Sequence, residues 1–182
     1  MFRILFVCSG NAGRSQMAAA FAQRIATKDM EITCAGDAHQ DVAPSASRVM
    51  TEIGVDIAPQ VTRTLGEIGT ESFDVVVTLC NNAREICPTF PGSPARVHWP
   101  LVDPARQDLT TSAEADEVFR QVRDEIRRRV EGLFQYGFLE SIRQVRQTLR
   151  RSWQRHRDLD VRLADDLVRL SDQEQLLRAA QE

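Results

Sequence analysis

The sequence predicts an α/β fold in which a four-stranded parallel sheet carries helices on both faces. Short apolar runs alternate along the chain with longer segments whose apolar residues recur at helical spacing. This alternation is typical of parallel strands joined by crossover helices. The chain of 182 residues is 42% hydrophobic, which is enough for one sizeable core and argues against disorder.

Four strands and three main helices are expected. The strands are residues 3–7, 31–34, 73–79 and 96–99. The helices are residues 15–27, 45–53 and 112–134. The third strand is the clearest because it is rich in β-branched residues, and Gly54 closes the second helix. The last helix is amphipathic, with an expected inner face of Val118, Val122, Ile126, Val130 and Leu133.

A change of composition near residue 137 predicts two parts, a domain of residues 1–136 and an α-helical C-terminal extension of residues 137–182. An apolar stripe along the extension consists of Leu139, Ile142, Val145, Leu149 and Trp153. We expect this stripe either to pack on the domain or to pair two subunits in a homodimer. Arginines crowd the same segment, either as a solvated face or as a site for an acidic partner. Residues 171–174 have the pattern of a capping box.

Charge and cysteine content limit the class of protein. The formal net charge of -3 gives no support for nucleic-acid binding, and no apolar run reaches the roughly 20 residues of a membrane helix. The N-terminal segment lacks the features of a signal peptide, so we expect a cytoplasmic protein. The cytosol keeps thiols reduced, so the four cysteines are expected to serve packing or chemistry. We expect Cys34, in the second strand, to be a core thiol.

Three chemically suggestive residues come shortly after predicted strands. Cys8 follows the first strand, Cys80 follows the third, and Asp103 comes shortly after the fourth. The carboxyl ends of parallel strands meet at one edge of a sheet, where ligands bind. The sequence therefore predicts a functional site at this edge.

The loop from Cys8 to Ser15 has the pattern C-x5-R-S between a strand and a helix. Its glycines are expected to let backbone N–H groups turn inward around an oxyanion, which Arg14 holds with its planar fork. The expected anion-binding residues are Ser9, Gly10, Asn11, Ala12, Gly13 and Arg14. This environment is expected to lower the pKa of Cys8 into the range of about 3.5–7.5 for activated thiols, with Ser15 hydrogen-bonded to the sulfur. The structural alternative is a buried cysteine followed by a helix cap.

The pair Cys80 and Cys87 is separated by seven positions. On a regular helix the two residues would lie about 10 Å apart along the axis, too far for a disulfide. Oxidation of the pair would therefore remodel residues 81–86. The alternatives are two core thiols or half of a zinc site. No metal site is expected, because His39, His98 and His156 lack companions at ligand spacing.

The run from Val7 to Ala18 resembles the active-site loop of the low-molecular-weight phosphatase fold. Within that fold it is most similar to the thioredoxin-coupled arsenate reductases, which continue Arg-Ser with Gln-Met-Ala as this chain does. The phosphatases usually continue with Pro. The resemblance covers roughly residues 1–135 and does not reach the C-terminal extension.

The resemblance implies a disulfide cascade that needs no bound cofactor. Cys8 would attack arsenate, and Cys80 would then attack Cys8, release arsenite and leave a Cys8–Cys80 disulfide. Cys87 would next attack Cys80, and thioredoxin would reduce the resulting Cys80–Cys87 disulfide. Glutaredoxin and a low-molecular-weight thiol are the alternative reductants. Asp103, on an Asp-Pro turn, would be the general acid, and Asn11 would brace the loop.

Two departures from the family pattern refine these expectations. Some members bind potassium beside the loop, but the matching positions here are Ala19 and Cys34, so we expect no such ion. Ala105 and Arg106 follow the Asp-Pro turn where phosphatases place aromatic residues, which favours a small inorganic oxyanion. The alternative function is a phosphatase that hydrolyses phosphomonoesters or phosphotyrosine through a Cys8 phospho-enzyme. A third hypothesis is a non-enzymatic oxyanion or redox sensor that signals through its helical extension.

Overall fold

The computed structural model describes residues 1–80, 87–92, 94–106, 111–135, 137, 139–145, 147–148, 151–152 and 154. The chain divides into two compact units, Met1–Ile142 and Arg143–Glu182. The sheet and the site belong to the first unit. The described residues of the second unit are helical.

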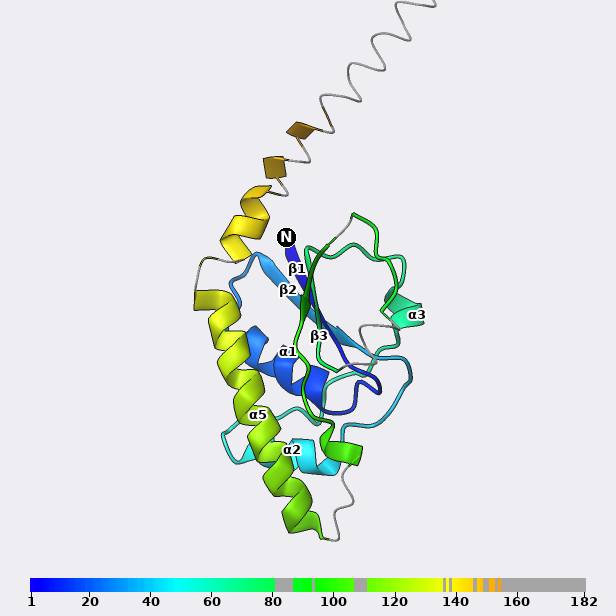
Figure 1. Cartoon of the computed structure of the whole chain (residues 1–182), viewed down its shortest axis with the longest axis vertical. Helices are drawn as coiled ribbons and strands as arrows, with labels where there is room; N and C mark the ends of the chain where they lie inside the picture. Colours follow the sequence, from blue (N-terminus) through cyan, green and yellow to red (C-terminus); the bar gives the residue numbers. More distant parts are fainter. Residues whose placement is uncertain are drawn as a thin grey trace, which may run out of the picture. The chain divides into compact units, whose positions relative to one another are not determined.

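The expected four-stranded parallel sheet is confirmed, with strand order β2-β1-β3-β4 (Figure 1). The strands are β1 (Phe2–Val7), β2 (Met30–Ala35), β3 (Val75–Thr78) and β4 (Ala95–His98). The central strands β1 and β3 are almost fully buried, which explains why their sequences are continuously apolar rather than alternating. The chain order reverses direction between β1 and β3, and this switch point is where such sheets bind ligands.

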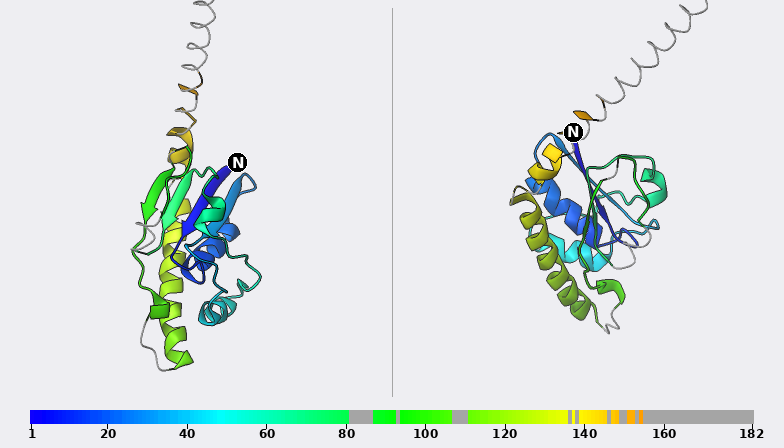
Figure 2. Two further views of the ribbon diagram at one scale, coloured as in Figure 1. Left: turned by 90° about the vertical axis from the view of Figure 1, so that its right-hand side faces the viewer. Right: turned by 45° about the horizontal axis from the view of Figure 1, so that its top comes forward.

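Three helices build the layer beside the sheet. They are α1 (Arg14–Ile25), α2 (Pro44–Thr51) and α5 (Ser112–Gln135). Helix α1 packs on β1 and β2, and α5 runs along α1 and α2 (Figures 1 and 2). The buried face of α5 includes Phe119 instead of the expected Val118, which is only half-buried. The apolar pattern therefore placed the start of this face one residue too early.

Two short elements were not expected from the sequence. Helix α3 (Leu65–Ile68) begins at a capping box between Thr64 and Glu67, and a 3-10 turn covers Pro104–Arg106. Helix α2 ends at Thr51, and Gly54 beyond it adopts a positive φ of 71°. The expected behaviour of residues 81–86 lies outside the described part of the chain.

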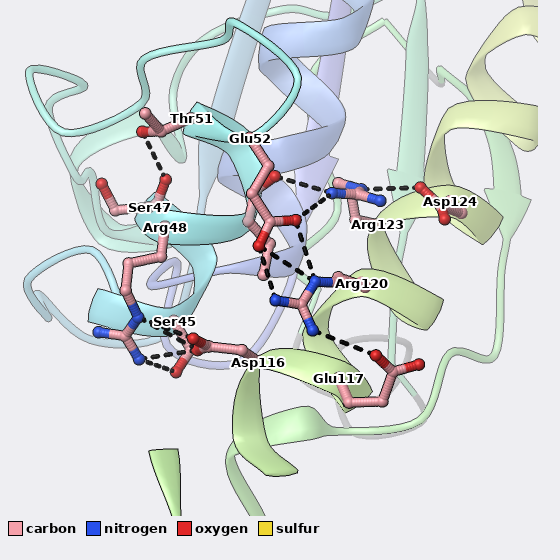
Figure 3. A network of polar contacts seen from close by, with 11 residues as sticks. Ser45, Ser47, Arg48, Thr51, Glu52, Asp116, Glu117, Arg120, Arg123 and Asp124 are labelled. Carbon is pink, nitrogen blue, oxygen red and sulfur yellow. Dashed lines mark hydrogen bonds and ion pairs between the residues drawn. The ribbon is translucent and has the colours of Figure 1, made fainter. Parts of the chain in front are cut away.

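Ion pairs join α2 to α5 (Figure 3). Arg48 of α2 pairs with Asp116, and Arg120 and Arg123 of α5 both pair with Glu52. Nη1 of the buried Arg123 also donates to the carbonyl oxygen of Val49 at 2.8 Å. That carbonyl belongs to the last turn of α2, where helix carbonyls lack partners of their own. The network thus fixes α5 on α2 and, with it, Phe119 beside the loop that follows β1.

The apolar stripe of the C-terminal segment begins on the body of the first unit. Leu139 is buried in its core and Ile142 packs against that core. Val145, in the second unit, is 59% exposed. Leu149, Trp153 and the expected capping box at residues 171–174 lie outside the described residues. No helix in the described part of the chain has both the length and the apolarity to cross a membrane.

Candidate active site

The expected residues gather at the carboxyl edge of the sheet, around a cavity of about 290 Å³. The loop after β1 forms its floor and the turn at Asp103 forms one wall. The lining residues are Cys8, Ser9, Gly10, Ala12, Gly13, Arg14, Asp37, Gln40, Ala43, Asp103, Pro104, Ala105 and Phe119. Asp37, Gln40 and Phe119 were missed from the sequence, although Asp37 and Gln40 follow the carboxyl end of β2 as Cys8 follows β1.

Asn11 organises the loop from the inside. It is fully buried and adopts a positive φ of 51°, a conformation that Asn tolerates better than most residues. Its Nδ2 donates to the carbonyl oxygen of Arg63 at 3.3 Å, and its own carbonyl oxygen accepts from Nε2 of Gln16 at 3.1 Å. These bonds anchor both the side chain and the main chain of Asn11.

The loop glycines serve close approach rather than positive φ. A Cβ atom at Gly10 would lie 2.2 Å from Oε1 of Gln40. A Cβ atom at Gly36, just after β2, would lie 2.5 Å from the backbone nitrogen of Asn11. The left-handed position of this loop is occupied by Asn11. The second strand and the segment after it therefore pack tightly against the loop.

Cys8 lies at the base of the cavity and is 2% exposed. Its Sγ is 2.9 Å from Oγ of Ser15, and Oγ of Ser15 donates to Oδ1 of Asn11 at 2.7 Å. A hydroxyl has one proton to give. A neutral Cys8 thiol can donate a hydrogen bond to Ser15 while Ser15 donates to Asn11. When Cys8 is a thiolate, Ser15 can donate its hydrogen bond to the sulfur instead. Ser15 is thus placed to serve both protonation states of the sulfur.

The pKa of Cys8 differs from the sequence expectation. Burial is the largest influence and raises the pKa of the Cys8 thiol above its ordinary value, while the hydrogen bonds of Ser15 and the charge of Arg14 lower it. The sequence indicated the two lowering influences but not the depth of burial. Arg14 also takes part in an ion pair.

That ion pair joins Nη2 of Arg14 to Oδ2 of Asp103 at 2.9 Å. Nη1 of Arg14 also donates to the carbonyl oxygen of Leu101 at 3.3 Å, and Nη2 lies 3.4 Å from Oγ of Ser9. Arg14 is 6% exposed and Asp103 is 25% exposed. Oδ1 of Asp103 accepts from the backbone N–H of Ala105 at 3.1 Å, which fixes the carboxylate at the cavity wall.

Cys80 lies beside the loop and is 5% exposed. Val7 pairs with Thr78 across β1 and β3, so Cys8 and Cys80 both follow paired strand ends. Sγ of Cys80 is 3.7 Å from Oγ of Ser9, the same hydroxyl that Arg14 contacts. The structure therefore brings Cys80 to the anion-binding loop.

Cys87 and Cys34 have different surroundings. Cys87 is buried, and burial raises its pKa while the nearby guanidinium of Arg96 lowers it. Burial, followed by the nearby Cys8, raises the pKa of Cys34 to about 12, which makes it an unreactive thiol. All four cysteines are free. Among the described residues, no group of three or more His, Cys, Asp or Glu side chains could hold a metal ion.

Two of the three histidines make polar side-chain contacts. Nδ1 of His98 lies 2.8 Å from Oγ1 of Thr78, and Nε2 of His39 lies 3.2 Å from a carboxylate oxygen of Glu67. His156 lies outside the described residues. Cys8, Arg14 and Asp103 are thus the reactive or charged groups of the cavity that the sequence singled out, and Cys80 lies beside its lining residue Ser9.

Comparison with known proteins agrees with this geometry. The chain is 39% identical over 134 residues to an arsenate reductase of Halalkalibacterium halodurans, covering 74% of this chain and 96% of that protein. It is 36% identical over 134 residues to an arsenate reductase of Bacillus subtilis, with the same coverage.

Solved structures give the same picture. An arsenate reductase in a phosphate-binding state is 31% identical, with a TM-score of 0.63, over 78% of this chain and 99% of that one. A thioredoxin-dependent arsenate reductase of Corynebacterium glutamicum is 25% identical, with a TM-score of 0.57, over 80% of this chain and 63% of that one. Residues 3–151 match the family model for low molecular weight phosphotyrosine protein phosphatases. The chain belongs to the low molecular weight phosphotyrosine protein phosphatase family.

Proposed function

We propose that this protein reduces arsenate to arsenite. The observation that carries the proposal is the position of Cys80, whose sulfur lies beside Ser9 in the loop that holds the Cys8 nucleophile. Hydrolysis of a phosphate ester needs a nucleophile, an arginine and an acid, but it has no use for a second thiol at this place. The arsenate reductases among the relatives support the same conclusion.

Substrate binding starts from the ion pair between Arg14 and Asp103. A tetrahedral oxyanion that enters the cavity accepts two hydrogen bonds from the planar guanidinium group of Arg14, which then no longer pairs with Asp103. The N-terminus of α1, which begins at Arg14, adds the favourable end of its dipole. Asp103 is then released from Arg14 and is free to approach the oxygens of the substrate.

The first chemical step joins the thiolate of Cys8 to arsenic. Asp103 takes up a proton once Arg14 no longer holds its carboxylate, and it passes this proton to the oxygen that leaves the arsenic centre as water. Ser15 stabilises the thiolate before the attack through the contact of its hydroxyl with the sulfur. The product is a covalent adduct of Cys8 and arsenate, in which arsenic is still pentavalent.

Reduction occurs when the thiolate of Cys80 attacks the sulfur of Cys8. A Cys8–Cys80 disulfide forms, the bond between sulfur and arsenic breaks, and its electron pair stays on arsenic, which leaves as arsenite. The two thiols are oxidised by two electrons and arsenic is reduced by two. Ser9 touches both Arg14 and Cys80, and thus links the anion site to this second thiol.

Cys87 then attacks Cys80 and regenerates Cys8, and an external dithiol reduces the Cys80–Cys87 disulfide. We assign this last role to thioredoxin, because a dithiol resolves a protein disulfide in one encounter and one structural relative is thioredoxin-dependent. The protein itself holds no cofactor in this scheme. Glutaredoxin or a low-molecular-weight thiol is the alternative reductant.

The C-terminal segment is proposed to be accessory to this chemistry. The relatives align over 134 residues, and every residue of the proposed cascade lies within residues 1–136. The helical extension, residues 137–182, is assigned no part in the reaction. Light scattering of the full chain tests whether the extension also pairs two subunits.

The test is arsenate-dependent oxidation of NADPH in the presence of thioredoxin and thioredoxin reductase, run beside hydrolysis of p-nitrophenyl phosphate. We expect turnover in the wild type and in the control Cys34→Ser, and none in Cys80→Ser. Cys87→Ser is expected to release about one equivalent of arsenite per enzyme and then stop, because the Cys8–Cys80 disulfide cannot be passed on. Hydrolysis without arsenate turnover, unaffected by Cys80→Ser, would make the protein a phosphatase.

A further inference from the structure

Cys87 has a neighbour that neither the sequence pattern nor the proposed cascade assigns to the reaction. It is Arg96, an exposed residue of the edge strand β4. Nη2 of Arg96 donates a hydrogen bond of 2.7 Å to the carbonyl oxygen of Pro88, the residue after Cys87. Arg96, at the edge of the sheet, thus holds the backbone directly beside Cys87.

The bond to Pro88 also places the positive charge of the guanidinium beside Cys87. Burial raises the pKa of the Cys87 thiol, and the guanidinium of Arg96 opposes this rise. An arginine carries five N–H donors and a delocalised charge, so one donor can hold Pro88 while the positive charge stays beside Cys87. The bond to Pro88 fixes the fork in place, and this spares the entropy that a free arginine side chain would lose.

Burial works against this influence. Cys87 is 9% exposed, and its burial disfavours the thiolate, which is the form that attacks a disulfide. Within the described part of the chain, Arg96 of β4 is the charged group that acts on this sulfur. A cation that faces a buried thiol stabilises the thiolate more strongly than it would in water.

We propose that Arg96 is a positioning residue that holds the backbone beside Cys87 and favours the thiolate of Cys87 when it attacks Cys80. The proposal rests on the proposed function, since it gives the second thiol exchange its nucleophile. The reaction is balanced in charge and electrons. The thiolate of Cys87 forms a bond with Cys80, the bond between Cys80 and Cys8 breaks, and its electron pair leaves on Cys8.

The negative charge thereby moves from a sulfur beside one arginine to a sulfur beside another. It starts on Cys87 beside Arg96 and ends on Cys8, where Arg14 and Ser15 receive it. No proton has to be transferred during the exchange. Arg96 therefore affects the second exchange and leaves the attack of Cys8 on arsenate, and the release of arsenite by Cys80, unchanged.

The experiment compares the full-length wild type with Arg96→Gln, Arg96→Lys and the control Arg24→Gln, which removes an exposed arginine from the end of α1. Reduced protein is treated with iodoacetamide over a range of pH, and alkylation of the Cys87 peptide is followed by mass spectrometry. In Arg96→Gln we expect alkylation of Cys87 near pH 7 to slow about tenfold, the effect of one pKa unit. The rates should converge at high pH, and Arg96→Lys should recover most of the loss.

A second readout uses one equivalent of arsenate without a reductant. Arsenite release should be equal in all variants, while formation of the Cys80–Cys87 disulfide should be slow only in Arg96→Gln, again most clearly near neutral pH. An unchanged alkylation profile, or a loss of equal size at every pH, would overturn the role of Arg96. If no variant releases arsenite, the proposed function fails, but the alkylation profile still decides whether Arg96 activates Cys87.

Discussion

Nη2 of Arg14 lies 2.9 Å from Oδ2 of Asp103, so the anion-binding arginine and the proposed general acid neutralise each other in this structure. Arg14 lowers the pKa of Cys8, but burial raises it more. It also sets an order of events, because an oxyanion that takes Arg14 releases the carboxylate for proton transfer. In the proposed mechanism, substrate binding and acid catalysis are coupled through this ion pair.

The first prediction separates these two roles of Asp103. In Asp103→Asn the charge of Arg14 is no longer compensated, so the pKa of Cys8 falls and alkylation of Cys8 by iodoacetamide shifts to lower pH. Inorganic phosphate should bind about two- to fivefold more tightly, because about 0.5–1 kcal/mol of competing ion pair is lost. Arsenate turnover should nevertheless drop, by about 10²–10⁴-fold, because the general acid is gone.

Asp41→Asn is the matched control, since it removes an exposed carboxylate from the loop after β2. It should change neither the alkylation profile of Cys8 nor the turnover. An alkylation profile in Asp103→Asn that coincides with that of the wild type would show that the ion pair does not influence the nucleophile.

Ser15→Ala should act on Cys8 in the opposite direction. The hydroxyl of Ser15 lowers the pKa of Cys8, so its removal raises that pKa and leaves less thiolate at neutral pH. We expect turnover near pH 7 to fall about tenfold for a rise of one pKa unit, and to recover as pH increases. The pH profile of kcat/KM measures this shift, and a uniform loss at every pH would argue against thiolate stabilisation by Ser15.

Cys34 makes a prediction about stability at alkaline pH. Its folded-state pKa of about 12 is above its ordinary value of 9.0, so the folded protein keeps a proton that the unfolded chain releases. The corresponding stability is present below pH 9 and is lost as pH rises towards 12, by at most about 1.4 kcal/mol per pH unit. Urea unfolding at several pH values should give a flatter pH dependence for Cys34→Ala than for the wild type. Equal slopes would contradict the burial of this thiol.

Arg123 should matter for stability more than its neighbours on α5. In Arg123→Met the carbonyl oxygen of Val49 loses its partner, which we expect to cost about 1–3 kcal/mol in the free energy of unfolding. Arg127→Met, which removes an exposed pair with Glu131, should change that energy by less than about 0.5 kcal/mol. Urea denaturation compares the two, and similar losses would mean that the network in Figure 3 is not centred on Arg123.

The sequence predicted the edge of the sheet at which the site lies, because strand ends in a parallel sheet meet at one edge whatever the details of packing. Cys8, Cys80 and Asp103 were located in this way. The ion pair of Arg14 with Asp103 could not be foreseen, since it depends on how the turn after β4 folds over the loop. The direction of the Cys8 pKa was missed because it is a balance between burial and charge.

Helix α3 and the inner face of α5 show two other limits. Helix α3 has only four residues, too few for a periodic pattern, and its one sequence signal is the capping box of Thr64 and Glu67. Val118 was placed on the inner face of α5, whereas Phe119 occupies it, because neighbouring helix positions differ by about 100°. That error hid a residue of the cavity wall.

The wall formed by Gln40 and Phe119 leads to a prediction about specificity. Oε1 of Gln40 lies over Gly10, and the ring of Phe119 lies 3.3 Å from where a Cβ atom of Gly13 would be. Together they narrow the cavity above the oxyanion loop, which suits arsenate better than an aryl phosphate. Gln40→Ala should raise the ratio of p-nitrophenyl phosphate hydrolysis to arsenate reduction by about threefold or more, as loss of a pocket contact typically does.

Gln40→Ala is the safer variant, because Gln40 is exposed, whereas Phe119→Leu also removes core volume from the interface of α5. Gln23→Ala, an exposed glutamine on α1, is the control and should leave the ratio unchanged. Both kcat/KM values are measured on the same preparation, so a general loss of folded protein cancels in the ratio. An unchanged ratio in both Gln40→Ala and Phe119→Leu would show that the wall does not select the substrate. The preference for arsenate would then come from the attack of Cys80 on Cys8.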